Sequence, residues 1–215
     1  MTQQAHGPDP ADIAAIRRAA EQVARGYRTR RLRGFVQDLA VEAGWRARGS
    51  HGRELRYGSL PELVLALGGT ARSARSRVLD WQPHGAAGSP GSCYANAATI
   101  ALSDSDFVYV EGYAQSLLFP VPHAWCVHLP TGQIVDPTWA SSAVRTGTGR
   151  AHYLGVRFAA DFVRANTGGD QPASLLESDW QRGFRALRYG FVTDSRGIVI
   201  ARDTARDTAR HQRTG

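Results

Sequence analysis

Two short, largely apolar segments at residues 124–129 and 133–139 are joined by a Pro-Thr-Gly turn at 130–132. Segments of this length that are bounded by turn residues are typical of β-strands, and a short connection containing glycine is typical of a β-hairpin. An alternating segment at 107–113 precedes them and reads as another strand. Because a hairpin places consecutive strands side by side, this part of the chain predicts an antiparallel sheet.

Helical patterns lie on both sides of these strands. Apolar residues recur at helical spacing in 12–25 and again in 31–43, and Gly44 is expected to end the second helix. Ser59 followed by Glu62 forms a capping box, which marks the start of a third helix. The other expected elements are a strand over 153–158 and helices over 59–67, 94–102, 159–165 and 175–189. Helices and an antiparallel sheet together predict the α+β class.

The 215 residues are enough for one domain with an appendage. We expect a disordered N-terminus over 1–10, a helical extension over 11–80 that packs on the core, and the core itself over 81–195. The end of the chain, 196–215, holds a short Ala-Arg-Asp-Thr repeat and few apolar residues, so we expect a disordered tail.

The net charge is +7, and all 26 basic residues are arginine. Residues 1–85 hold 14 arginines and 8 acidic residues, a net charge of +6, whereas 86–160 hold 3 arginines and 4 acidic residues, a net charge of −1. The basic excess favours a solvated helical surface, with an acidic partner for the N-terminal helices as the alternative. Nucleic acid is not favoured, because the arginines are not interleaved with aromatic residues.

No apolar stretch approaches the ~18 residues that a membrane helix needs, and no basic segment followed by an apolar run marks a signal peptide. We therefore expect a cytoplasmic protein without a membrane partner. The two cysteines, Cys93 and Cys126, are too few for a disulfide scaffold, and no Cys-x-x-Cys pair indicates zinc. No cofactor is expected. A metal site that includes both cysteines would need residues from opposite strand faces to converge.

Cys93 stands where a catalytic thiol would be expected. It follows a Gly-Ser loop and opens the alanine-rich helix, and both a helix N-terminus and a nearby histidine lower the pKa of a thiol. The alternative is a buried small hydrophobic residue, which is the common role of a free cysteine. Position alone does not separate the two interpretations.

His123 and Asp136 fall on the same face of the predicted hairpin. His123 begins a strand in which it shares a face with Trp125, while Cys126 faces the other way. A two-residue turn would set Asp136 about 13 Å from His123 along the sheet. A four-residue loop over 128–131 would place Asp136 directly opposite His123, and a catalytic triad requires this longer loop.

The order Cys, His, Asp on a helix and two strands resembles the transglutaminase-like superfamily of papain-like thiol enzymes. The resemblance is carried by HAWCVHLPTGQIVDPTW at 123–139, by YVEGYA at 109–114 and by GSCYANA at 91–97, under a quarter of the chain. It implies a papain-like core, with the nucleophile helix packed on an antiparallel sheet. It also implies Cys93 as nucleophile, His123 as general base and Asp136 as the residue that orients it.

Four further side chains are candidates for oxyanion binding or for lining the site. An oxyanion hole needs two donors, and the Cys93 backbone N–H supplies one. The candidates are Gln82 or Gln115 as the second donor, Asn96 as an orienter of the loop, and Trp125 as a shield of the His–Asp pair. Trp139 is expected to pack in the core, and Glu111 and Tyr113 to line the cleft.

The residues predict a cysteine-nucleophile enzyme that forms an acyl-enzyme on Cys93 and cleaves an amide bond, as a peptidase or a protein-glutamine deamidase does. The alternative is an acyltransferase of the transglutaminase type, in which an amine replaces water. A second alternative is an inactive binding scaffold. The substrate expected for the enzyme is an amide in a peptide or protein.

Overall fold

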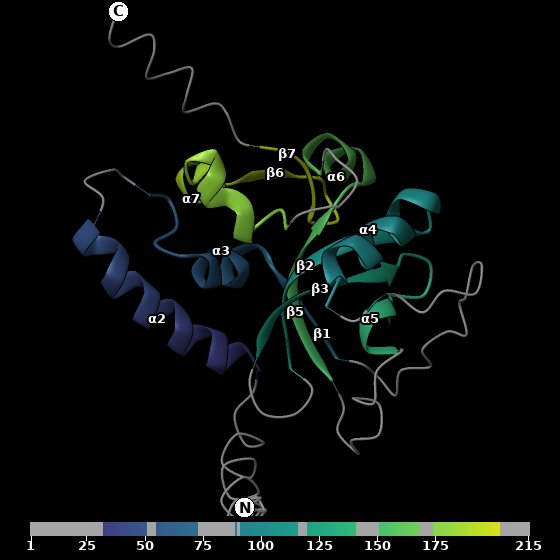
Figure 1. Cartoon of the computed structure of the whole chain (residues 1–215), viewed down its shortest axis with the longest axis horizontal. Coiled ribbons are helices and arrows are strands. Elements are labelled where there is room, and N and C mark those ends of the chain that lie inside the picture. The colour runs from purple at the N-terminus through teal and green to yellow at the C-terminus, as the bar shows by residue number, and fades with distance from the viewer. Residues whose placement is uncertain are drawn as a thin grey trace, which may run out of the picture.

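The computed structural model describes residues 32–50, 55–72, 89, 91–115, 120–140, 151–167 and 174–202 (Figure 1). They form helices around one sheet, which confirms the α+β class. The helices are α2 (Leu32–Ser50), α3 (Leu60–Leu67), α4 (Cys93–Ser103), α5 (Pro137–Ala140), α6 (Ala160–Asn166), the 3-10 helix η3 (Glu177–Arg182) and α7 (Arg185–Tyr189).

Within the described residues the sheet has seven strands, of which six follow the order β4-β3-β2-β5-β7-β6. The strands are β1 (Gly69–Arg72), β2 (Phe107–Gln115), β3 (Val121–His128), β4 (Gln133–Val135), β5 (His152–Phe158), β6 (Phe191–Thr193) and β7 (Ile198–Arg202). Strand β5 lies antiparallel to β2 on one side. Its other side pairs with β1 at one end and, in parallel, with β7 at the other.

Helix α4 packs on β2 and β3 (Figure 1). Ala97, Ala98 and Ala101 on this helix are buried, which lets the helix backbone approach the sheet. The Cys126 thiol of β3 donates a hydrogen bond to the Ala97 carbonyl oxygen at 3.1 Å. Cys126 therefore faces α4, on the same side of the sheet as the main core.

The opposite face of the sheet holds a second apolar cluster around Trp125. The ring of Trp125 needs the space above Gly155, because a Cβ built there would lie 2.6 Å from ring carbon Cη2. Gly155 pairs with Gly112 of β2, where a Cβ would meet the Leu154 carbonyl oxygen at 2.3 Å. The two glycines allow β2 and β5 to pair closely beneath a buried indole.

The third predicted helix begins and ends where expected. The Glu62 backbone N–H donates to Ser59 Oγ at 3.3 Å, and Gly68 is the C-cap of α3. The Glu62 carboxylate accepts from the Gly58 backbone N–H at 2.8 Å. The prediction that Gly44 ends the second helix is wrong, since α2 continues to Ser50. A glycine inside a helix costs only about 1 kcal/mol relative to alanine and does not force an end.

Three other predictions need correction. The helix expected over 175–189 is two short helices, because Gly183 and Phe184 both adopt positive φ angles, 70° and 58°. The tail expected from residue 196 begins instead with β7, which is hydrogen-bonded to β5 and β6. The boundary expected at residue 80 does not separate the extension from the core, because β1 at 69–72 belongs to the sheet. The predictions for 1–10, 12–25 and 203–215 concern residues outside the described part of the chain.

The hairpin between β3 and β4 has a four-residue loop, but its register differs from the predicted one. His128 pairs with Gln133, so the loop spans 129–132, and Asp136 comes level with Trp125 instead of His123. His128 stays in the strand because its ring packs on Phe107 at 5.0 Å between centroids. The second strand also ends at Val135 and not at residue 139, since α5 begins at Pro137.

Candidate active site

Asp136 lies between the end of β4 and the start of α5. Proline has no N–H to donate to a strand ladder and is favoured in the first turn of a helix, so Pro137 ends the strand and begins α5. Asp136 Oδ1 accepts hydrogen bonds from the backbone N–H groups of Thr138 at 3.1 Å and Trp139 at 3.0 Å. These bonds fix the carboxylate and leave Oδ2 to face the sheet.

Asp136 Oδ2 binds two side chains from two strands. It lies 2.8 Å from His123 Nε2 and accepts from the Tyr153 hydroxyl at 3.1 Å. His123 and Asp136 are only 3% and 5% exposed. The predicted His–Asp pair is therefore formed, diagonally across the hairpin, and it is shielded from water.

Two indole rings hold the His123 imidazole. Trp139 stacks on it at 4.4 Å between centroids and 21° between planes, and Trp125 lies at 6.4 Å and 17°. Trp125 was expected to be the shield and Trp139 a core residue, but Trp139 is the nearer ring. The order of the two follows from α5, which folds Trp139 back over the strand instead of continuing it.

Cys93 is the first residue of α4, and its side chain is half-buried. Ser92 occupies the N-cap position but makes no side-chain cap hydrogen bond, so its hydroxyl does not satisfy the first N–H groups of the helix. A hydrogen bond between Cys93 and His123 joins the helix to the strand. Because Nε2 binds Asp136, Nδ1 is the ring nitrogen left for the sulfur.

The contacts with Asp136 and Cys93 shift the pKa of His123. Burial lowers it, but hydrogen bonds with Asp136 and with Cys93, together with their negative charges, raise it to about 9. The contacts that favour imidazolium therefore outweigh the loss of water. A histidine with this pKa is charged at neutral pH, and it can stabilise a thiolate beside it.

Asn96, one turn into α4, connects the two halves of the site. Its side-chain N–H group donates to the Ser89 carbonyl oxygen at 3.0 Å and to Thr138 Oγ1 at 2.9 Å. The first partner belongs to the segment before Cys93, and the second follows Asp136. Asn96 therefore connects α4 to the segment before Cys93 and to the start of α5.

Of the two candidate glutamines, Gln115 is among the described residues. Gln115 is buried near the end of β2, three residues beyond Gly112, which pairs with His123. Three residues of strand span about 10 Å, so Gln115 lies away from the residue that pairs with His123. Gln82 lies outside the described residues.

Sequence reasoning missed the contributions of Tyr153 and Thr138. Tyr153 is on β5, two strands away from β3, and no local pattern connects it to Asp136. Thr138 had a weak signal, because it follows Asp136 by two residues in an Asp-Pro-Thr turn. Glu111 and Tyr113, expected to line the cleft, both border a shallow hollow between α3 and the start of α4, although Glu111 is only 2% exposed.

The sheet separates Cys126 from His123, which the alternative of a metal site would need to bring together. Burial raises the pKa of the Cys126 thiol well above its ordinary value, and the thiol faces α4. His123 points to the other face. Within the described part of the chain, no three His, Cys, Asp or Glu side chains are grouped as metal ligands would be. Nor does any helix in that part have the length and apolar character to cross a membrane.

Comparison of the chain with protein-family models, with curated proteins and with solved structures finds no significant match.

Proposed function

We propose that this protein is a cysteine-nucleophile enzyme that forms an acyl-enzyme on Cys93 and cleaves an amide bond. The observation that carries the proposal is the position of His123, whose ring is bound through Nε2 to Asp136 while it also bonds to Cys93. The packing of α4 on the antiparallel strands β2 and β3 supports assigning the core to the papain-like, transglutaminase-like type.

In the proposed reaction the Cys93 thiolate attacks the carbonyl carbon of the amide. The negative charge moves to the carbonyl oxygen, to which the backbone N–H of Cys93, the first residue of α4, would donate a hydrogen bond. The His123 imidazolium gives its proton to the departing nitrogen as the C–N bond breaks. Asp136 keeps the imidazole ring in orientation and stabilises its positive charge.

Water resolves the acyl-enzyme in the second half of the proposed reaction. Neutral His123 then takes a proton from the water as its oxygen attacks the thioester, and Cys93 leaves as thiolate. The same intermediate can pass to an amine, which makes acyl transfer the alternative outcome. Exclusion of water from the acyl-enzyme decides between them.

The test uses p-nitrophenyl acetate as acyl donor and follows the mass of the intact protein. We expect a transient acetyl adduct on Cys93 in the wild type and in Cys126→Ser, and none in Cys93→Ala. His123→Ala should slow both formation and decay of the adduct. An adduct that forms at the same rate without His123, or forms on Cys126, would contradict the proposed roles.

A second arm adds glycine methyl ester as a competing amine. Decay of the adduct at an unchanged rate, with acetate as the product, supports hydrolysis. Accumulation of the N-acetylated amine in proportion to its concentration would assign the acyltransferase activity instead. Cys93→Ala with the amine present is the matched control for uncatalysed transfer.

A further inference from the structure

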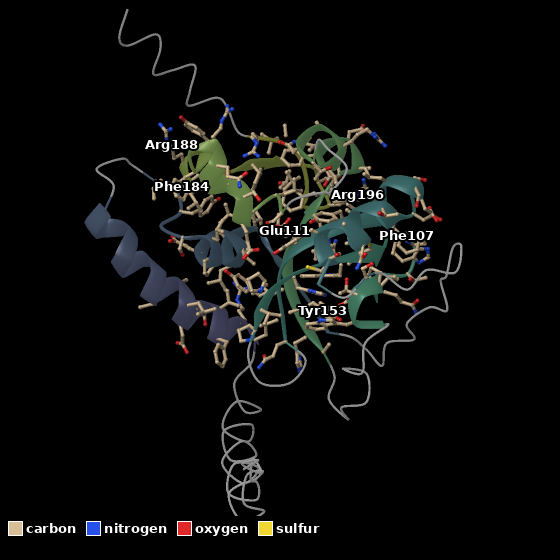
Figure 2. All side chains as sticks on the ribbon, viewed as in Figure 1. Phe107, Glu111, Tyr153, Phe184, Arg188 and Arg196 are labelled. Carbon is tan, nitrogen blue, oxygen red and sulfur yellow. The ribbon has the colours of Figure 1, made fainter. Side chains whose placement is uncertain are left out.

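Glu111 of β2 is a buried acid that the proposed reaction does not use. Figure 2 shows it near the middle of the molecule, between α3 and α4. By strand alternation it lies on the face of the sheet that holds Cys126 and is covered by α4, opposite to the His123 side chain. A buried carboxyl group is costly unless its oxygens are bound, so its partners indicate its role.

Each oxygen of Glu111 accepts one hydroxyl and one backbone N–H from the described residues. The donors to Oε1 are the Ser174 hydroxyl and the Leu176 N–H at 2.9 Å, and those to Oε2 are the Tyr109 hydroxyl at 3.0 Å and the Leu175 N–H at 2.8 Å. Burial raises the pKa of Glu111, and these bonds oppose that rise by favouring the carboxylate. Three of the four donors belong to 174–177, the segment that leads into η3, so Glu111 attaches this segment to the sheet.

The two backbone N–H groups need an acceptor at both oxygens of Glu111. A protonated oxygen still accepts a bond while it gives its proton to the neighbouring hydroxyl, so the attachment survives protonation of the acid. Glutamine differs, because its NH₂ group cannot accept a hydrogen bond. In Glu111→Gln one of the N–H groups of Leu175 and Leu176, both buried, would lose its acceptor.

The 174–177 segment also binds the first turn of α4. The Glu177 backbone N–H donates to Ser174 Oγ at 2.7 Å, so this hydroxyl joins Glu177 to Glu111. The Glu177 carboxylate in turn accepts from the Tyr94 hydroxyl at 2.5 Å. Tyr94 is half-buried and follows Cys93 directly. Hydrogen bonds therefore connect β2 without a break to the residue beside the proposed nucleophile.

The position of the first turn of α4 depends on contacts made by side chains. Ser92 makes no side-chain cap hydrogen bond, and Asn96 bonds to Thr138 at the start of α5. Tyr94 attaches the same turn to η3. Because Cys93 must keep its bond to a histidine on β3, and a misplacement of about 1 Å can cost roughly 100-fold in rate, both attachments bear on the nucleophile.

We propose that Glu111 is a positioning residue for Cys93: it holds the 174–177 segment on the sheet, and through that segment Glu177 fixes Tyr94. The inference rests on the proposed function and adds a requirement to it. The bonds lie on the face of the sheet that α4 covers, so they act on the helix that carries the thiol and leave the His–Asp pair unchanged.

The first test measures alkylation of Cys93 by iodoacetamide in variants of the contact with α4. Tyr94→Phe and Glu177→Ala should each slow the reaction about 3- to 10-fold at pH 7, within the range that one hydrogen bond to a carboxylate allows. The loss should be smaller at pH 9, where a thiol ionises without assistance. Glu177→Gln keeps an acceptor for the tyrosine hydroxyl and should restore the rate to within about twofold of the wild type. A Glu177→Gln protein as slow as Glu177→Ala would overturn the inference.

The second test asks whether Glu111 acts through Tyr94. Glu111→Gln alone should slow alkylation as Tyr94→Phe does, and the double variant should be no slower than the slower single variant, because both changes break one connection. Effects that multiply in the double variant would overturn the inference, as would an unchanged rate in Glu111→Gln. Ser174→Ala cuts the same connection with a smaller buried change and takes the place of Glu111→Gln if that variant does not fold.

Val199→Ala provides the matched control for lost stability. Val199 is fully buried on β7, which β5 separates from β2. The change should lower the urea midpoint without slowing alkylation of Cys93. Slowing equal to that in Glu111→Gln would overturn the positioning role, because lost stability alone would then account for the effect.

The alkylation and acylation tests fail separately, because iodoacetamide reacts with a thiol whether or not the protein is an enzyme. A Cys93 that forms no acetyl adduct, but whose alkylation depends on Glu111 and Tyr94, would refute the proposed enzyme and leave the positioning role. An acetyl adduct that forms on Cys93 at the wild-type rate in Glu111→Gln and in Tyr94→Phe would refute only the positioning role.

Discussion

Replacing Asp136 with asparagine removes the main contact that raises the pKa of His123. A pKa raised from 6.5 to about 9 corresponds to about 3 kcal/mol in favour of the imidazolium. Asparagine has the same shape and can still cap α5, but it carries no charge. Burial, which lowers the pKa, should then dominate, so that His123 becomes mostly neutral at pH 7.

The assay is the rate of Cys93 alkylation by iodoacetamide between pH 5.5 and 9, with the modified residue identified by mass spectrometry. An unassisted thiol is only a few per cent thiolate near neutral pH, which limits the expected loss at pH 7 to about 10- to 30-fold. At pH 9 the two proteins should react at similar rates. The Cys126→Ser variant should match the wild type throughout.

The reasoning would be refuted by an alkylation profile in Asp136→Asn that superimposes on that of the wild type. Such a result would mean that Asp136 only caps α5 and has no effect on the charge of His123. Far-UV circular dichroism of both proteins separates this outcome from unfolding.

The same pKa predicts how stability depends on pH. The folded-state pKa of His123 lies above the unfolded value of 6.5, so its contribution is fully present below pH 6.5 and is lost as the pH rises through about 9. We expect the free energy of unfolding, measured in urea, to fall by up to about 3 kcal/mol across that range. In Asp136→Asn the decline should be much smaller, and an equal decline in both proteins would count against His123 as its source.

Three further changes test the surroundings of the site. Gly155→Ala should lower the free energy of unfolding, measured in urea, by about 3 kcal/mol, because the added carbon would overlap the Trp125 ring and the Glu111 backbone; a cost under about 1 kcal/mol would contradict this packing. Tyr153→Phe removes one of the hydrogen bonds to Asp136. It should shift the high-pH part of the Cys93 alkylation profile to lower pH by less than one unit and reduce the free energy of unfolding by about 1 kcal/mol. Asn96→Ala should slow the alkylation of Cys93 with little change in the melting temperature. An unchanged alkylation rate would refute its positioning role.

The sequence predicted the parts of this fold that depend on local chemistry. Ser59 and Glu62 mark the start of α3 because a capping box is satisfied within one turn of helix. The prediction that His123 and Asp136 share one face is correct because a hairpin loop with an even number of residues keeps these two side chains on the same face. Each of these inferences needed only neighbours in the chain.

The errors came from contacts that the chain makes at a distance. The register of the hairpin depends on His128, whose packing against Phe107 on β2 keeps it in the strand. Strand β7 was read as tail because residues 198–202 are followed by a long polar repeat, while its burial depends on pairing with β5. Tyr153 reaches Asp136 only after β2 and β5 have paired. None of these partners can be located by periodicity.

The shortness of β4 connects the fold to the proposed chemistry. Strand β4 pairs with β3 only along 126–128, because Pro137 cannot continue the ladder and Asp136 turns the chain into α5. The turn carries Thr138 to Asn96 on α4 and carries Trp139 onto the His123 ring. A longer β4 would run Asp136 past His123 as an ordinary strand residue, with no helix to cap and no contact to α4. The Asp-Pro-Thr-Trp sequence therefore acts as one unit, which stops a strand, starts a helix and leaves a buried carboxylate bound to His123.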